Sequence, residues 1–300
     1  MPTLDFLDDP RDFLDAAGEH LAADPVQSTV VATVTARAVE EDAAGVSLPL
    51  GLDRWWAVAR DDAGRVVGTA MRTAPAPPFP VFVSSMPEDA AAALGRALLA
   101  RGALLTSVNG ALPAARTCAE EVARATGGRV VVAEHTRLFE LRELREPRPV
   151  PGRLVTATAD DVDLAVAWFD AFAVDADRQA GREPVPDPLR HDRPAMERRV
   201  AAGRVWLWED DEGRRVHLVA ANLPAYGVTR IGPVYTPAAE RGRGWAGAAV
   251  AEVSRRVLAA GDRPVLYTDQ ANPVSNRVYE RLGYTAVVDQ ANLEIVPVDA

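Results

Sequence analysis

The sequence contains a single cysteine, Cys118, and no lysine, so all 33 of its basic residues are arginines. One cysteine excludes an intrachain disulfide, a cysteine-based metal cluster and a dithiol redox pair. The residues around it, 115–125, have the composition of a helix, where a lone cysteine usually serves as a small buried hydrophobic group. We therefore assign no chemistry to Cys118, and we interpret the missing lysine as a compositional bias without functional meaning.

The chain also lacks long apolar segments and an excess of positive charge. No apolar stretch approaches the roughly 18 residues of a membrane span, and the N-terminal segment MPTLDFLDDPRDF has neither the basic nor the apolar part of a signal peptide. We therefore expect a cytoplasmic protein with no membrane partner. The formal net charge of -10 argues against a nucleic-acid partner, which requires a basic face, and mildly favours a cationic amine.

A change in composition near residue 150 predicts two domains. The 300 residues exceed the roughly 100 to 200 of a usual single domain. Within residues 141–154, LRELREPRPVPGRL, three closely spaced prolines, Pro147, Pro149 and Pro151, favour an extended linker. We expect one domain over residues 1–146 and a second over residues 152–300.

The two halves contain a worn internal repeat. Residues 56–72 and 205–222 each read as two apolar strands joined by an Asp/Gly turn, which is a strong hairpin signal. Each hairpin is followed by an apolar run, an Ala-rich helix, a short strand and a further helix. The sequence therefore predicts two α/β (α+β) domains of one fold, each with a mixed, mostly antiparallel sheet flanked by helices. In the second half we expect strands at 153–158, 204–210, 215–222, 228–235, 264–269 and 285–296, and helices at 160–175, 189–202, 242–260 and 273–282.

The segment ERGRGWAG, residues 240–247, occurs only in the second half and fits two kinds of diphosphate-binding loop. Gly242, Gly244 and Gly247 satisfy the dinucleotide fingerprint G-x-G-x-x-G. That fingerprint requires a tight turn at the start of a large parallel sheet. Here six residues separate the preceding strand from Gly242, and the chain remaining after the loop is too short for such a sheet. A nicotinamide dehydrogenase is therefore the least favoured class.

A second motif follows the helix that the loop introduces. Residues 266–284, LYTDQANPVSNRVYERLGY, contain N-x-x-S-N-x-x-Y-x-x-x-G-Y, and the loop itself contains R-x-x-G-x-A. Together these motifs closely resemble the GCN5-related N-acetyltransferase (GNAT) superfamily. The resemblance covers about residues 152–296, and tandem members with one degenerate half exist in the superfamily. It implies that the second half is a catalytic acetyltransferase domain, whereas residues 1–146 form a degenerate domain without the pyrophosphate loop.

The resemblance also implies which residues bind acetyl-CoA, the expected co-substrate. Backbone N–H groups at the helix start suit a diphosphate, and the glycines let it approach closely. The pantetheine arm is expected to pair with the preceding strand. Asn276 is expected beside the pantetheine, and Tyr279 matches the tyrosine that acts as general acid toward the CoA sulfur. The expected cofactor-binding residues are Val234, Tyr235, Thr236, Arg241, Gly242, Arg243, Gly244, Trp245, Ala246, Asn276 and Tyr279.

Two further positions are interpreted from local patterns. Asn272 with Pro273 predicts the start of a helix, because asparagine is a preferred cap and proline a preferred first residue. Glu209 and Asp210 are candidates for the general base, although the segment EDDEG is also typical of a solvated hairpin turn. His217, Tyr235 and Asp269 are alternatives, and a water relay would require no single base.

The expected function is N-acetyl transfer from acetyl-CoA to a primary amine of a small molecule or peptide, by direct attack in a ternary complex and without a metal. The first alternative is a non-catalytic acyl-CoA-binding sensor or scaffold, and the second is an enzyme of the two-domain mycothiol synthase type. A homodimer is compatible with the sequence. The acceptor and the acyl-chain preference are not encoded in any motif.

Overall fold

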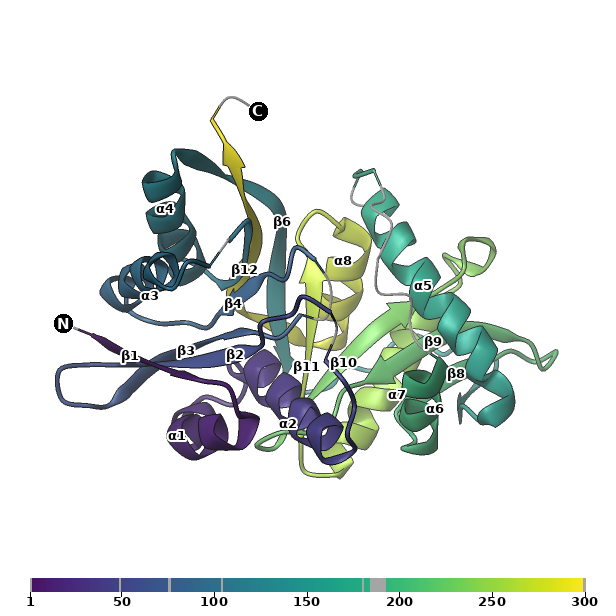
Figure 1. Ribbon diagram of the computed structural model, residues 1–300. Coiled ribbons are helices and arrows are strands. Elements are labelled where there is room, and N and C mark those ends of the chain that lie inside the picture. Colours follow the sequence, from purple (N-terminus) through teal and green to yellow (C-terminus); the bar gives the residue numbers. More distant parts are fainter. Residues whose placement is uncertain are drawn as a thin grey trace. The chain divides into compact units, whose positions relative to one another are not determined.

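The computed structural model describes residues 2–48, 50–74, 77–103, 105–179, 181–183 and 193–298 (Figure 1). The chain forms two compact units. Unit 1 contains Met1–Leu138 and Val287–Ala300, and unit 2 contains Phe139–Ala286. Within the described residues, none of the helices has the length and apolar character needed to cross a membrane.

The sheet of unit 1 has the strand order β1-β2-β3-β4-β5-β12, and its neighbours are antiparallel except for the parallel pair β4 and β5. Trp55 and Ala57 face a core that includes α3 and α4, whereas the alternate residues Trp56 and Val58 face a core that includes α1 and α2. This alternation is the period of a strand buried on both faces. The elements are β1 (Thr3–Leu7), α1 (Pro10–Ala23), α2 (Thr29–Ala43), β2 (Trp55–Arg60), β3 (Val66–Arg72), β4 (Val81–Val83), α3 (Glu88–Ala100), β5 (Ser107–Ala111) and α4 (Ala114–Thr126), followed by β6 (Gly128–Leu141).

Unit 2 has the same arrangement. Its strands have the order β11-β10-β9-β8-β7, with only the β10 and β11 pair parallel. Val205 and Leu207 face α5 and α6, and Trp208 faces α7 and α8. The elements are β7 (Arg153–Thr156), α5 (Val162–Gln179), α6 (Arg193–Ala201), β8 (Val205–Glu209), β9 (Arg215–Ala221), β10 (Val228–Tyr235), α7 (Trp245–Ala259), β11 (Arg263–Asp269) and α8 (Pro273–Leu282). The last strand, β12 (Tyr284–Pro297), begins in unit 2, and from Val287 onward it belongs to unit 1. A mostly antiparallel sheet is not the parallel sheet that a dinucleotide fingerprint requires.

The predicted elements of the second half are present within a few residues of their expected ends. The largest differences concern three helices. α5 ends at Gln179 rather than 175. α7 begins at Trp245 rather than 242, because residues 241–244 form the turn before it. α6 begins at Arg193, and the part of the prediction over residues 189–192 lies outside the described residues.

The last strand joins the sheet of unit 1. Residues 290–294 of β12 pair antiparallel with β5, and Arg137 forms a two-pronged ion pair with Asp289, with N–O distances of 2.6 and 3.0 Å. Buried backbone groups must find partners, and these residues find them in unit 1. The division of the chain therefore differs from the expected domains of 1–146 and 152–300.

The proline-rich segment also differs from its expectation as a linker, because it packs on unit 2. The Pro151 carbonyl accepts the Trp208 indole N–H at 2.9 Å. A Cβ added at Gly244 would lie 2.8 Å from the Val150 side chain. The proline-rich segment thus packs against the glycine loop.

Candidate functional site

The glycine loop forms an anion-binding turn at the start of α7. Gly242 and Gly244 have φ angles of 79° and 89°, which glycine adopts far more readily than other residues. α7 has no side-chain cap and no acidic residue in its first turn, so its first N–H groups are available and the positive end of the helix dipole is not offset. This geometry fits a diphosphate.

The strand that leads into the loop separates from its neighbour. β10 pairs with β11 only over residues 228–230 and 263–265 in the described structure, although β10 continues to Tyr235. A register shift interrupts its pairing with β9 between Ile231 and Val234. The last part of β10 therefore presents an edge toward the gap beside β11, which an extended chain can pair with.

Two adjoining cavities occupy this region of unit 2. The first, of about 360 Å³, is lined by the glycine loop and the start of α8, and the second, of about 450 Å³, is lined by β10, α5 and α6. Phe172, Val234 and Tyr279 line both. A diphosphate at the loop, with a pantetheine arm along β10, would bring a thioester to the junction of the two cavities. The residues present therefore fit an acyl-CoA.

Both arginines of the loop have carboxylate partners within unit 2. Arg241 donates to the Thr236 carbonyl at 3.0 Å and to the Asp175 carboxylate at 2.6 Å. Arg243 lies 3.1 Å from the Glu240 carboxylate. Asp175 lies on α5 and also accepts the Tyr235 hydroxyl at 3.0 Å. Each arginine of the loop is thus offset by one carboxylate, and the ion pair with Asp175 fixes Arg241 in the lining of the first cavity.

Tyr279 lies at the junction of the cavities. Its side chain is buried, and its ring meets the ring of Tyr284 edge-on at a centroid distance of 6.0 Å. Burial raises the pKa of the Tyr279 hydroxyl well above its ordinary value of 10. The phenol therefore stays protonated at neutral pH, which suits a proton donor and excludes a base.

Trp245 and His217 are buried residues that pack next to the glycine loop. The Trp245 ring packs 6.4 Å from the ring of Trp208, so its indole contributes packing while its backbone begins the helix. His217 is fully buried, and its Nδ1 lies 2.8 Å from the Thr236 hydroxyl. Burial lowers the pKa of His217 to about 3. His217 therefore stays neutral at physiological pH. It holds the Thr236 hydroxyl by a hydrogen bond, and it is not exposed to an acceptor.

The two asparagines of the second motif stabilise the loop before α8. Asn272 caps this helix by accepting the N–H groups of Val274 and Ser275 at 3.2 and 3.1 Å, which confirms the predicted cap. The Asn276 amide donates to the carbonyls of Asp269 and Asn272 at 3.1 and 2.8 Å. Asn276 does not line either cavity, so in this structure its amide serves the loop rather than a ligand.

The structure does not place the two base candidates at the site. Glu209 accepts hydrogen bonds from Arg153 and Arg215, which lower its pKa. Asp210 closes the hairpin turn, where the backbone N–H groups of Arg214 and Glu212 and the Arg214 guanidinium lower its pKa. Neither carboxylate lines the two cavities. We correct the expectation accordingly: both are structural carboxylates, because their own hairpin and neighbouring strand supply the cations that bind them.

Several lining residues were missed by the sequence analysis. Asp175, Phe172 and Arg281 line the loop cavity, and Arg199 and Arg230 line the other. The amphipathic pattern of α5 could have indicated one cavity-facing side for Phe172 and Asp175. No local signal marks the other three, since arginine is frequent throughout the chain.

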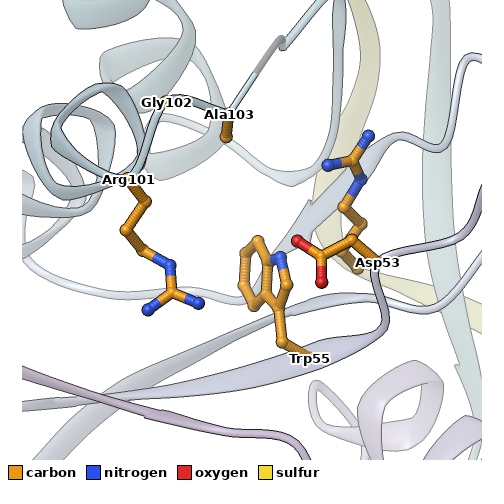
Figure 2. A pocket seen from close by; sticks show the side chains of 6 residues that line it. Asp53, Trp55, Arg101, Gly102 and Ala103 are labelled. Atoms are coloured by element: carbon orange, nitrogen blue, oxygen red, sulfur yellow. The ribbon is translucent and has the colours of Figure 1, made fainter.

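Unit 1 also contains a cavity, of about 480 Å³. It lies at the carboxyl end of a helix, whereas the loop cavity of unit 2 lies at an amino end. It is lined by residues that follow α3, Arg101, Gly102 and Ala103, together with Asp53, Trp55 and Arg72. Figure 2 shows the Trp55 indole with Asp53 on one side and Arg101 on the other. The carboxyl end of a helix is its negative end, so this cavity does not reproduce the loop site. Among the described residues, no group of three His, Cys, Asp or Glu side chains could hold a metal ion.

Comparisons with known proteins agree with this fold. Residues 211–293 match the family model FR47-like protein, whereas no curated protein matches the sequence. A GCN5-related N-acetyltransferase from Sphaerobacter thermophilus is 17% identical with a TM-score of 0.57, over 97% of this chain and 95% of that one. A Drosophila protein is 13% identical with a TM-score of 0.63, over 98% of each chain.

A tandem architecture is found in a third solved structure. A tandem GNAT protein from the clavulanic acid biosynthesis pathway is 15% identical with a TM-score of 0.55, and 98% of each chain is covered. These identities establish the fold and not the substrate. The chain therefore has the fold of these GCN5-related N-acetyltransferases in its tandem form, and residues 211–293 are similar to the FR47-like family.

Proposed function

We propose that unit 2 transfers the acetyl group of acetyl-CoA to a primary amine. The observation that carries this proposal is the position of Tyr279 at the junction of two cavities, one beside an anion-binding loop and one beside the separated end of β10. A co-substrate site and an acceptor site must meet at the reacting atoms, and holding both reactants there supplies much of the rate.

The residues around the loop account for co-substrate binding. The N–H groups of residues 241–246 and the side chains of Arg241 and Arg243 would hold the diphosphate. The edge of β10 at Val234, Tyr235 and Thr236 would pair with the pantetheine arm, and a backbone N–H there would polarise the thioester carbonyl. Arg281 adds a third guanidinium to the lining of the loop cavity.

Acetyl-CoA supplies the activated carbonyl. The neutral amine nitrogen forms a bond to the carbonyl carbon, the carbon–sulfur bond breaks, and the products are an amide and CoA. The amine loses one proton, and the departing sulfur gains one from the Tyr279 hydroxyl, whose raised pKa keeps it protonated until then. The carboxylates lining the loop cavity, Asp175 and Glu240, are both ion-paired, so we propose that water accepts the amine proton and that the Tyr279 phenolate regains its proton from water.

That pairing of the lining carboxylates also favours a second candidate function, an acyl-CoA sensor that binds without transfer. The two functions differ in one measurable product. We expect purified protein to release free thiol from acetyl-CoA when a suitable primary amine is present. A sensor would bind acetyl-CoA and release none with any amine of a broad panel.

Calorimetric titration tests the binding step first. We expect one acetyl-CoA per chain, no NADH binding, and loss of acetyl-CoA binding in an Arg241→Ala, Gly244→Asp variant. Absence of acetyl-CoA binding would overturn the proposal. Two sites per chain would overturn the assignment of a single loop to unit 2.

A further inference from the structure

The cavity of unit 1 is lined by charged groups that the acetyl-transfer chemistry of unit 2 does not use. Its described lining contains two guanidinium groups, Arg72 and Arg101, and one carboxylate, Asp53. Its volume of about 480 Å³ is that of a small-molecule site. A ligand complementary to this lining carries both signs of charge and has one more negative group than positive groups.

These charged groups are not neutralised by neighbouring residues. Among the residues that the structure describes, the side chains of Asp53 and Arg101 form no hydrogen bond and no ion pair. Arg72 uses only its Nε, which donates to the Phe79 carbonyl at 3.2 Å. The terminal nitrogens of Arg72 are left for a ligand. Binding at this cavity therefore does not require an ion pair to be broken first.

Aromatic rings hold both guanidinium groups in place. The Arg101 guanidinium lies 4.3 Å from the centroid of the Phe6 ring, which meets the Trp55 ring edge-on at 5.2 Å. The Arg72 guanidinium lies 5.8 Å from the centroid of the Phe79 ring. A guanidinium that is already oriented by a ring loses less side-chain entropy when an oxyanion binds to its N–H groups.

The charged groups come from two places around Trp55. Arg72, the last residue of β3, pairs with Trp55, the first residue of β2, so their side chains share one face of the sheet. Asp53 lies two residues before Trp55, at the same end of this hairpin, whereas Arg101 follows the last residue of α3. Figure 2 shows Asp53 and Arg101 on opposite sides of the indole.

The Trp55 indole adds a hydrogen-bond donor to this arrangement. Figure 2 shows its nitrogen on the side of the ring that faces Asp53. The side chain is 1% exposed, and its N–H has no hydrogen-bond partner within the described part of the chain. A buried indole N–H usually has a partner, which a ligand in the cavity would supply.

We propose that this cavity binds an α-amino acid whose side chain ends in a second carboxylate. Asp53 binds the ammonium group, and Arg72 and the Trp55 indole N–H bind the α-carboxylate, which shares a carbon atom with that ammonium. The side chain of the ligand crosses the indole, and Arg101 binds its carboxylate. The site lies within unit 1 and does not depend on the acetyl transfer proposed for unit 2.

Three small molecules test the inference on the full chain without acetyl-CoA. L-Glutamate has all three charged groups, L-glutamine has a neutral side chain of the same length, and glutarate lacks the ammonium group. We expect L-glutamate to bind at least about tenfold more tightly than either of the others, by calorimetry or ligand-observed NMR. If L-glutamate binds no more tightly than L-glutamine or glutarate, the inference is overturned.

The first substitution removes the guanidinium that is assigned to the side chain of the ligand. Arg101→Met keeps an aliphatic chain on Phe6, and we expect it to weaken L-glutamate by about tenfold and to leave L-glutamine unchanged. Arg101 is exposed, so its substitution does not disturb the core. Arg96→Met is the matched control, because Arg96 lies on α3, pairs with Glu121 and does not line the cavity.

The second substitution removes the carboxylate that is assigned to the ammonium group. We expect Asp53→Asn to weaken L-glutamate and L-glutamine by about tenfold each and not to weaken glutarate. Asp15→Asn is the control, because Asp15 is exposed on α1 and does not line the cavity.

These variants also separate this site from the acetyl-transfer site, since L-glutamate is itself a primary amine. If Arg101→Met and Asp53→Asn both bind L-glutamate normally, the amino acid lies elsewhere and the inference is overturned. The Arg241→Ala, Gly244→Asp variant, which is expected to lose acetyl-CoA, should bind L-glutamate normally. Loss of L-glutamate in that variant would also overturn the inference, whereas absence of acetyl-CoA binding in the unaltered protein would overturn only the proposed function.

Discussion

The helix starts of α3 in unit 1 and α7 in unit 2 occupy the same place in two copies of one fold, and they differ in the features that an anion requires. α7 follows two glycines in the left-handed conformation and has no acidic residue in its first turn. α3 follows Pro87 directly and carries Glu88 and Asp89 in its first turn. These carboxylates stabilise the helix but repel a diphosphate.

The strands before these helices differ in a related way. In unit 1 all three residues of β4 pair with β5, whereas in unit 2 β10 extends well beyond its last pair with β11. A closed pair of strands leaves no edge for an added chain. One fold can therefore have or lack an anion-binding helix start and an unpaired strand edge through a few residues, while its core packing persists.

The largest effect is expected from a substitution that disrupts the glycine loop of unit 2. Gly244→Asp adds a carboxylate to the anion site, forces a side chain into a φ of 89°, and brings a Cβ to 2.8 Å from Val150. We expect the acetyl-CoA dissociation constant to rise by about 100-fold or more. Gly64→Asp in unit 1 is the matched control, since Gly64 has a φ of 78° and open space around it. Equal losses in the two variants would contradict the site.

The next effect concerns catalysis at the cavity junction. Tyr279→Phe removes the proposed proton donor without changing the ring, so we expect kcat to fall by about 100-fold with the KM for acetyl-CoA unchanged. Tyr284→Phe removes the hydroxyl of the ring beside it, which lies 2.8 Å from the Ser254 hydroxyl, and should cost only about 1 kcal/mol of stability. Steady-state kinetics on both variants distinguishes the roles, and an unchanged kcat for Tyr279→Phe would remove Tyr279 from the mechanism.

The third prediction concerns the free energy of unfolding of each unit and how it changes as the pH is lowered. Burial lowers the pKa of His217 in unit 2 from 6.5 to about 3, so between these values the unfolded state binds the proton and stability falls as the pH is lowered. At pH 5 the expected loss is about 2 kcal/mol relative to neutral pH. In unit 1, burial also lowers the pKa of the half-buried His20.

Hydrogen exchange measured separately in β9 and β2 resolves the two units. We expect His217→Asn to reduce the pH dependence in β9 and to leave that in β2 as it was. An unchanged pH dependence in β9 would show that His217 is not buried as a neutral group.

The smallest expected effect concerns the ion pair between Arg241 and Asp175. Asp175→Asn removes the carboxylate that pairs with Arg241 but keeps an oxygen for the Tyr235 hydroxyl. We expect acetyl-CoA to bind about threefold more tightly at low salt, and the gain to disappear at high salt. Asp177→Asn on the same helix is the control, because Asp177 pairs with Arg182 and does not line the loop cavity. Weaker binding in Asp175→Asn would instead make Asp175 a positioning residue for Arg241.

The parts of this protein that were predictable depend on short-range patterns. The cap at Asn272, the turns at Asp210 and Gly213, and the burial of Cys118, whose pKa burial raises to about 12, all follow from neighbouring residues. The same is true of most strand and helix ends in the second half. Each of these features needs only a few bonds of chain to form, so local composition determines it.

The features that were missed or differ depend on contacts between distant residues. Asp175 meets Arg241 across 66 positions of sequence, and Glu209 meets Arg153 across 56. The last strand was expected to complete the second domain, but residues 290–294 of it pair with β5. Charges and strand edges have many possible partners, and packing alone selects among them.

The sequence by itself therefore determined that the chain repeats one α/β fold, that only the second copy has a diphosphate-type loop, and that Tyr279 follows it on a helix, because these depend on periodicity, glycine and spacing. Only the tertiary structure decided that β10 separates from β11 beside Tyr279, and that Arg199 and Arg230 share one cavity. Those arrangements come from long-range packing, which brings together residues that no local pattern connects.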